Sequence, residues 1–195
     1  MEIFSLLDLD NIHETFKRFS SIKEPLEAKI FAVNESISSH QLSKLKIRSL
    51  YYSGDFPNEP VFYGILKFKF YENPGLAFGI SVGGLGWLLF IITALITSYI
   101  FYYLLMGKNF YRYESLALSL ILGGAIGNLI DRSFTLFNLF GYDGVIDFID
   151  LGFGNSFRWP YIFNLADMSV SIGIIIFITC SFFNSKPNEL DNENT

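Results

Sequence analysis

The sequence predicts a mainly α-helical membrane protein, in which a bundle of transmembrane helices is joined to β-structure. Of its 195 residues, 51% are hydrophobic, which is too apolar for an ordinary soluble domain of this length. Long apolar runs occupy most of the second half of the chain. A segment just before these runs alternates apolar and charged side chains, which is the period of a β-strand. One domain is expected from the length.

Residues 1–60 are mixed and polar, with no apolar run long enough to cross a bilayer. We therefore expect a polar N-terminal extension that precedes the membrane domain. Acidic residues stand where a signal peptide would carry basic ones, so no signal peptide is expected. Within this part, residues 11–22 fit a short amphipathic helix.

Composition also excludes several kinds of ligand. The net charge of −5 gives no reason to expect a nucleic-acid partner. The histidines, His13 and His40, and the single cysteine, Cys180, lack the spacing of metal ligands. The sequence therefore predicts neither a metal site nor a cofactor.

The membrane domain is expected over residues 61–184, and it opens with a strand at residues 61–73. Leu66 and Phe68 alternate with Lys67 and Lys69 in this segment, and the turn residues of "ENPG" end it. One face of the strand should pack and the other should be wet. Three apolar spans follow, at about residues 83–107, 115–131 and 161–184. The acidic end, residues 185–195, is expected to be a disordered cytoplasmic tail.

The short loops indicate how the spans are oriented. Lys108 and Arg112 lie between the first and second spans, whereas the loop between the second and third is rich in aspartate. The positive-inside rule places the basic loop in the cytoplasm and the acidic loop outside. The sequence thus predicts a multi-pass membrane protein.

Polar residues recur at one end of the last two spans. Asn128 and Asp131 are three residues apart and share a helix face, and Asn164 and Asp167 repeat the spacing. The two faces meet if the spans pack together. Alternatively, Asn164 and Asp167 only cap their helix. The glycines of "GGAIGN" allow close helix packing, which is a structural role in itself.

A further carboxylate, Asp147, lies between Ile146 and Phe148. Apolar surroundings raise the pKa of a carboxyl group, and two neighbouring carboxylates do not both ionise easily. The ionised member of such a pair can take a proton from water while the protonated member stabilises the carbonyl oxygen under attack. No serine or cysteine here has an evident histidine base. Hydrolysis by a water molecule that an aspartate pair activates is the simplest chemistry available.

Four motifs in this order resemble those of the bacterial lipoprotein signal peptidases, the type II signal peptidases. They are "ENPGLAFG" at 72–79, "GNLIDR" at 127–132, "GVIDF" at 144–148 and "FNLAD" at 163–167. Together they are highly specific, and the resemblance runs from residue 61 to about residue 183.

The resemblance implies an intramembrane aspartic endopeptidase. Such an enzyme removes the signal peptide of a prolipoprotein, cutting just before a cysteine that already carries diacylglycerol. The catalytic pair corresponds to Asp147 and Asp167. Substrate-contacting or supporting positions correspond to Asn73, Gly75, Ala77, Asn128, Asp131, Arg132 and Asn164, of which Asp131 has a structural role. The resemblance further implies a location in the bacterial plasma membrane, with a small extracytoplasmic β-sheet and an active site on that side. It also implies lipidated prolipoproteins and membrane lipids as partners, and a monomer.

The chain departs from the family in two places. The connection before Gly144 is several residues longer and brings Asp143 as a rival acid, while Asp150 is expected to face solvent. The family also has a fourth, N-terminal span that carries a D-Q-x-(S/T)-K motif. Asp8 and Asp10 offer only a faint echo of that motif. We expect a true start upstream or, alternatively, a degenerate relative without activity.

A small transporter would also keep carboxylates within its spans. Such a protein should carry polar residues across the whole membrane thickness. The acids and amides here gather toward one end of the last two spans instead, which favours proteolysis near the membrane surface.

Overall fold

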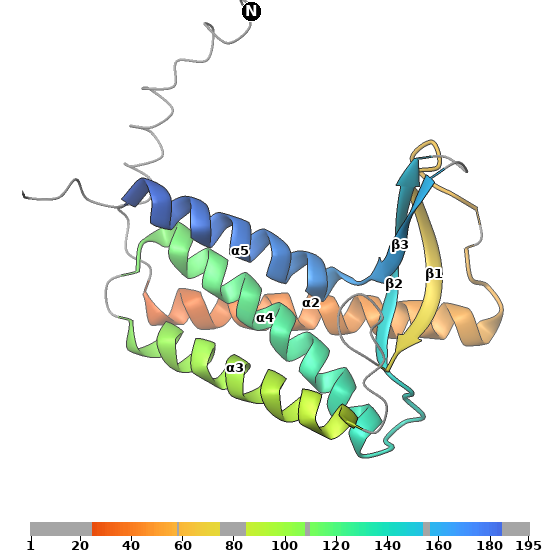
Figure 1. The fold of residues 1–195 in the computed structure, drawn as a ribbon, viewed down its shortest axis with the longest axis horizontal. Coiled ribbons are helices and arrows are strands. Elements are labelled where there is room, and N and C mark those ends of the chain that lie inside the picture. Colours follow the sequence, from red (N-terminus) through yellow and green to blue (C-terminus); the bar gives the residue numbers. More distant parts are fainter. Residues whose placement is uncertain (1–24, 58, 75–84, 108–109, 154–156, 185–195) are drawn as a thin grey trace, which may run out of the picture.

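The computed structural model describes residues 25–57, 59–74, 85–107, 110–153 and 157–184. This part of the chain forms four helices and three strands (Figure 1). In chain order they are α2 (Leu26–Ser53), β1 (Leu66–Asn73), α3 (Gly86–Met106), α4 (Arg112–Leu136), β2 (Val145–Phe153), β3 (Phe157–Phe163) and α5 (Leu165–Asn184). The helix expected at 11–22, the positions of Asp8, Asp10, Gly75 and Ala77, and the tail at 185–195 lie outside the described residues.

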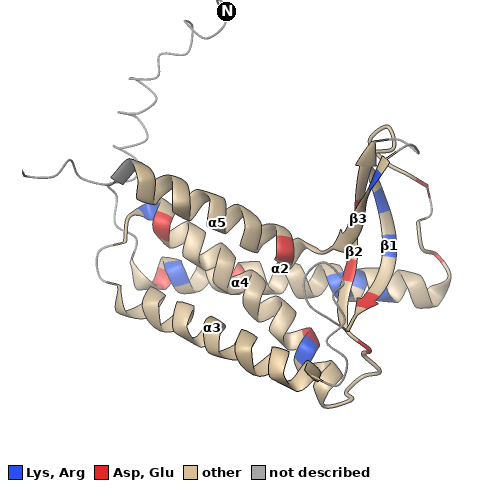
Figure 2. Ribbon diagram, in the orientation of Figure 1, with Lys and Arg blue, Asp and Glu red and all other residues tan. Residues whose placement is uncertain are grey.

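Three of these helices, α3, α4 and α5, are long and apolar enough to cross a membrane. Helix α3 contains no charged residue, and the one charged residue of α5, Asp167, lies in its first turn. The charge colouring of Figure 2 follows this distribution. Many of the large apolar side chains of α3 and α5 are exposed on the surface, as expected of helices that face lipid. The predicted class, a mainly helical membrane protein with a small β-sheet, is confirmed.

Helix α4 is central because its small residues let two helices approach it closely. A Cβ atom on Gly123 would stand 2.3 Å from the Ser36 hydroxyl oxygen on α2. A Cβ atom on Gly124 would stand 2.4 Å from the Ala166 carbonyl oxygen on α5. The close packing expected of these glycines is confirmed, and it brings the polar ends of α4 and α5 together.

Helix α2 lies within residues 1–60, which were expected to be a polar extension, and it packs against the membrane-spanning helix α4. It is 28 residues long, about 42 Å, and it runs beside α4 towards the sheet (Figure 1). Its buried face carries polar side chains at helical spacing, namely Lys29, Ser36, His40 and Lys44. The same face also carries the apolar Val33 and Ile47. Because buried polar groups need partners, its polar part requires polar atoms opposite it, and α4 supplies some of them to Lys44.

The sheet is antiparallel, in the order β1-β2-β3. The predicted first strand begins at Leu66 rather than Val61, because Phe62 and Tyr63 adopt positive φ angles in a tight turn. As predicted, the apolar side chains of β1 pack inward, and they join a cluster around Ile146 and Phe148 of β2.

Strands β2 and β3 occupy a region that the sequence analysis treated as a loop and as the start of the last span. That span was expected from residue 161, but Tyr161–Phe163 belong to β3, where Phe163 pairs with Ile149. Pro160 fits this arrangement because β3 is an edge strand. The last span therefore begins at Leu165, directly after the sheet.

Candidate active site

The two predicted catalytic aspartates meet at one residue, Asn164. Asp147 comes from the middle strand β2 and is 2% exposed, and Asp167 comes from the first turn of α5. The Asn164 side-chain amide donates a hydrogen bond of 2.6 Å to Asp147 Oδ1. Its backbone N–H donates one of 3.0 Å to Asp167 Oδ2. The strand and the helix thus deliver their carboxylates to the same place.

The cap of helix α5 fixes Asp167. Asn164 Oδ1 accepts hydrogen bonds from the backbone N–H groups of Ala166, at 2.8 Å, and Asp167, at 3.1 Å. The Asp167 carboxylate accepts the Asn164 N–H in return, which is a reciprocal capping arrangement. The alternative role of these residues as a helix cap is therefore real, and it orients the predicted catalytic group.

Asp147 lies in surroundings that disfavour its charge. Burial, followed by the nearby charge of Asp167, raises the pKa of Asp147 to about 7, although hydrogen bonds from Asn73 and Asn164 act in the opposite direction. Asn73 Nδ2 donates to Asp147 Oδ2 at 3.0 Å. Gly144 allows β1 to approach, since a Cβ atom there would stand 2.4 Å from the Asn73 carbonyl carbon. Asp147 is therefore suited to carry a proton near neutral pH.

Asn128 of α4 connects the pair to the helix bundle. Its Nδ2 donates to Asp167 Oδ1 at 2.7 Å, and its Oδ1 accepts from Asn164 Nδ2 at 3.2 Å. Lys44 Nζ of α2 also donates to Asn128 Oδ1, at 2.8 Å. The prediction that the polar faces of α4 and α5 meet is confirmed for Asn128.

Asp131 turns toward α2 and the sheet instead. It forms an ion pair of 2.8 Å with Lys44, and neither side chain is exposed. Asp131 Oδ2 also accepts the backbone N–H of Ile146 at 3.1 Å, one residue before Asp147. Asp131 therefore ties α2 and α4 to the start of β2, a geometry that fits the structural role expected of it.

The sequence analysis missed Lys44, although a signal was present. Residues 40–44 read His-Gln-Leu-Ser-Lys, which fits the D-Q-x-(S/T)-K motif except that His40 replaces the aspartate. Gln41 Nε2 donates to the Gly127 carbonyl oxygen at 2.8 Å, so this stretch of α2 packs on the turn of α4 that carries Asn128. His40 is buried, its Nε2 lies 2.9 Å from the Ser36 hydroxyl, and its Nδ1 has no hydrogen-bond partner.

Arg132 supplies further positive charge beside the pair. Its guanidinium interacts electrostatically with Asp167, Asp147 and Asp131, and its Nε is buried without a hydrogen-bond partner. In the described ranges, no cluster of three or more His, Cys, Asp or Glu side chains is arranged to hold a metal ion.

The expectation that Asp150 faces solvent is wrong. Asp150 is 1% exposed and pairs with Lys69 at 2.9 Å and Arg158 at 3.1 Å. Burial alone would raise its pKa, but the hydrogen bonds and charges of these two cations outweigh burial and hold the pKa below its ordinary value. Asp150 therefore stabilises the sheet. Asp143, the other rival acid, is exposed and interacts with Glu72.

Comparison with known proteins agrees with this arrangement. The model of the signal peptidase (SPase) II family matches residues 36–183. The chain belongs to the signal peptidase II family. The match begins within α2 and includes His40 and Lys44, so the family region is wider than the motifs indicated.

Individual relatives agree with the family assignment. The chain is 37% identical over 124 residues to a lipoprotein signal peptidase of Psychromonas ingrahamii, which covers 62% of this chain and 66% of the relative. It is 38% identical over 136 residues to a lipoprotein signal peptidase of Bacillus pumilus, and the match covers 70% of this chain and 80% of that relative. A bacterial membrane enzyme solved by the in meso method at 1.9 Å resolution has a TM-score of 0.64 at 29% identity, covering 85% of this chain and 99% of that one. A second such structure, at 2.3 Å, has the same TM-score and identity.

Proposed function

We propose that this chain is an intramembrane aspartic endopeptidase that removes signal peptides from diacylglyceryl-modified prolipoproteins, cutting on the N-terminal side of the lipidated cysteine. Membership of the signal peptidase II family supports this proposal. The observation that carries it is the convergence of Asp147 and Asp167 on Asn164. Two carboxylates from separate elements, held by shared amides, are the arrangement that acid–base activation of water needs.

The surroundings of the two carboxylates support a different role for each in the proposed reaction. Asp147, with a pKa raised to about 7, keeps the proton and offers it to the carbonyl oxygen of the scissile peptide. Asp167 takes a proton from the attacking water as the oxygen bonds to the carbonyl carbon. That proton then passes to the leaving amine, and Asp147 recovers its own when the C–N bond breaks.

Neighbouring residues hold this geometry. Asn73, Asn128 and Asn164 fix the carboxylate oxygens, and Arg132 stabilises negative charge near them. The pair lies where the membrane helices meet the sheet, so a lipid anchor in the bilayer would present the scissile bond at that depth (Figure 1). The positive-inside rule supports an extracytoplasmic location for this end, at the plasma membrane. We propose that the enzyme acts as a monomer.

The direct test replaces each aspartate by asparagine and follows processing of a purified, lipidated prolipoprotein in lipid bicelles. Asp147→Asn and Asp167→Asn should each reduce the cleavage rate by roughly 100-fold or more, because each removes one proton-transfer group. Asp143→Asn is the matched control and should cleave at the wild-type rate. Normal cleavage by either dyad variant would refute the assignment. A wild-type chain that folds but does not cleave would instead support the degenerate relative.

A further inference from the structure

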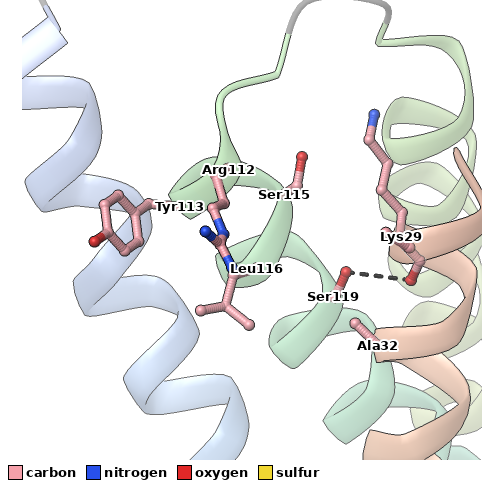
Figure 3. Close-up of a pocket in the computed structure, with 8 residues that line it drawn as sticks. Lys29, Ala32, Arg112, Tyr113, Ser115, Leu116 and Ser119 are labelled. Carbon is pink, nitrogen blue, oxygen red and sulfur yellow. Dashed lines mark hydrogen bonds between the residues drawn. The ribbon is translucent and has the colours of Figure 1, made fainter. Parts of the chain in front are cut away.

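A second polar site lies at the end of α4 opposite to the aspartates. A cavity of about 420 Å³ opens between the first turns of α2 and α4 (Figure 3). Ser115 in this cavity and Asp131 near the active site are sixteen residues apart on one helix, which is about 24 Å along its axis. The cavity is therefore separate from the catalytic pair.

One side chain in the cavity lacks a partner. Ser115 is 2% exposed, and its hydroxyl has no hydrogen bond. Buried hydroxyl groups nearly always have a partner, because leaving one unpaired is costly. Ser119, one turn further along α4, is satisfied by the Lys29 carbonyl oxygen at 3.5 Å (Figure 3). The Ser115 hydroxyl can therefore donate a hydrogen bond to an acceptor bound in the cavity.

The charge of the cavity indicates the sign of that acceptor. Lys29 and Arg112 line it, and no acidic side chain is among its lining residues in the described part of the chain. Lys29 is 6% exposed and is held in place by the Gly107 carbonyl oxygen at 3.1 Å and by the Phe110 ring, whose centroid is 4.9 Å away. The dipole of α4 adds little, because the Glu114 carboxylate already caps its first turn by accepting the Tyr111 N–H at 3.1 Å, so the positive charge comes from Lys29 and Arg112. An anion is the matching ligand.

The remaining walls indicate which anion. Leu116 and Ala32 make part of the lining apolar, and the cavity lies at the end of a membrane-spanning helix. Basic pockets between membrane helices on the cytoplasmic side suit phospholipid headgroups, whose phosphate has several acceptor oxygens. We propose that this cavity binds the phosphate group of an anionic phospholipid, with Ser115 and Arg112 as donors and Lys29 as a second cation. Free inorganic phosphate could form the same polar contacts, but it has no acyl chain to pack against the apolar wall.

The test measures lipid binding to the purified full-length chain. Native mass spectrometry and thermal unfolding are recorded in phosphatidylcholine nanodiscs that contain increasing fractions of phosphatidylglycerol. The wild type should retain phosphatidylglycerol, and Ser115→Ala and Arg112→Gln should each weaken this binding about tenfold, because each removes a bond to a charged oxygen. Lys46→Gln, which removes an exposed charge elsewhere on α2, should bind like the wild type.

A second arm separates lipid from free phosphate and controls for folding. In pure phosphatidylcholine nanodiscs, millimolar inorganic phosphate should not stabilise the wild type, whereas stabilisation equal to that by phosphatidylglycerol would overturn the lipid assignment. Prolipoprotein cleavage by Ser115→Ala should match the wild type, which shows that the variant is folded. Equal lipid affinity of Ser115→Ala and Lys46→Gln would overturn the site itself.

Discussion

Replacing Asp147 with asparagine should change how stability depends on pH. Because the folded-state pKa of about 7 lies above the ordinary value of 3.8, the folded protein holds this proton more tightly than the unfolded chain does. The resulting stabilisation is fully present below the ordinary pKa and is lost as pH rises through about 7. Asparagine does not titrate, so Asp147→Asn lacks this contribution.

The size of the effect follows from the two pKa values. Integrating the difference in bound protons between about pH 5 and about pH 8 gives a loss of roughly 2.5 kcal/mol in the free energy of unfolding of the wild type. The Asp147 side chain is 2% exposed, so solvent screening reduces this energy only slightly. Asn73 and Asn164 both donate hydrogen bonds to Asp147. In Asp147→Asn the new amide N–H₂ group faces one of these donors, and this mismatch lowers the free energy of unfolding by about 1–3 kcal/mol at every pH.

Unfolding by sodium dodecyl sulfate in mixed micelles, followed at several pH values, measures this difference. Other groups titrate in both proteins, so subtracting the two curves isolates Asp147. The variant should be the less stable protein at about pH 5, and the gap should shrink or reverse by about pH 8. Parallel curves for the wild type and Asp147→Asn would refute the assignment of the raised pKa.

Other contacts make further predictions. Lys44→Met should lower the free energy of unfolding by about 3–5 kcal/mol, because it leaves the buried Asp131 without its ion-pair partner. Adding Asp131→Asn should recover part of this loss in chemical unfolding, and no recovery would contradict the ion pair. Gly144→Ala should cost about 1–3 kcal/mol and slow cleavage, since its Cβ would collide with the Asn73 backbone; unchanged cleavage would argue against a role for that contact. Asp150→Asn should lower stability by about 1–2 kcal/mol but keep the cleavage rate per folded molecule, and selective loss of that rate would move the catalytic assignment to Asp150.

The sequence predicted the parts of the fold that lipid determines. A helix that faces lipid must be apolar over most of its length, so α3 and α5 could be predicted from their composition alone. The spacing of Asn128 from Asp131 and of Asn164 from Asp167 then indicated which faces of two spans meet. Periodicity sufficed only in part, because Asn164 is the cap that precedes α5 rather than a helical residue, and Asp131 turns toward Lys44 of α2 instead.

Strands β2 and β3 escaped prediction because their pattern is not an alternation of apolar and polar residues. Val145 to Asp150 are buried on both faces, and two aspartates within them find partners only after the chain has folded. A buried strand that includes charges resembles a loop when read locally. The partners of Asp150, Lys69 and Arg158, come from the two flanking strands, and no local rule identifies them.

Helix α2 escaped prediction for a related reason. Its inward face is polar, so neither an apolar run nor an apolar stripe marks it as part of a membrane domain. The pattern is meaningful only beside α4, where Lys44 meets Asp131 and Asn128. His40 added to the difficulty, since it replaces the acidic residue that would have marked the motif.

Counting charges around the site shows why this polar helix matters for the proposed chemistry. Among the residues that the structure describes there, Lys44 and Arg132 are cations, whereas Asp131, Asp147 and Asp167 are carboxylates. With the imidazole of His40 uncharged at neutral pH, the cluster is electrically neutral only when one carboxylate holds a proton. A buried net charge is costly, so the interior favours the singly protonated state. Lys44 neutralises Asp131, Arg132 offsets one further negative charge, and the remaining proton falls to Asp147. The charges that hold α2 against α4 therefore also favour the singly protonated aspartate pair that the proposed mechanism requires.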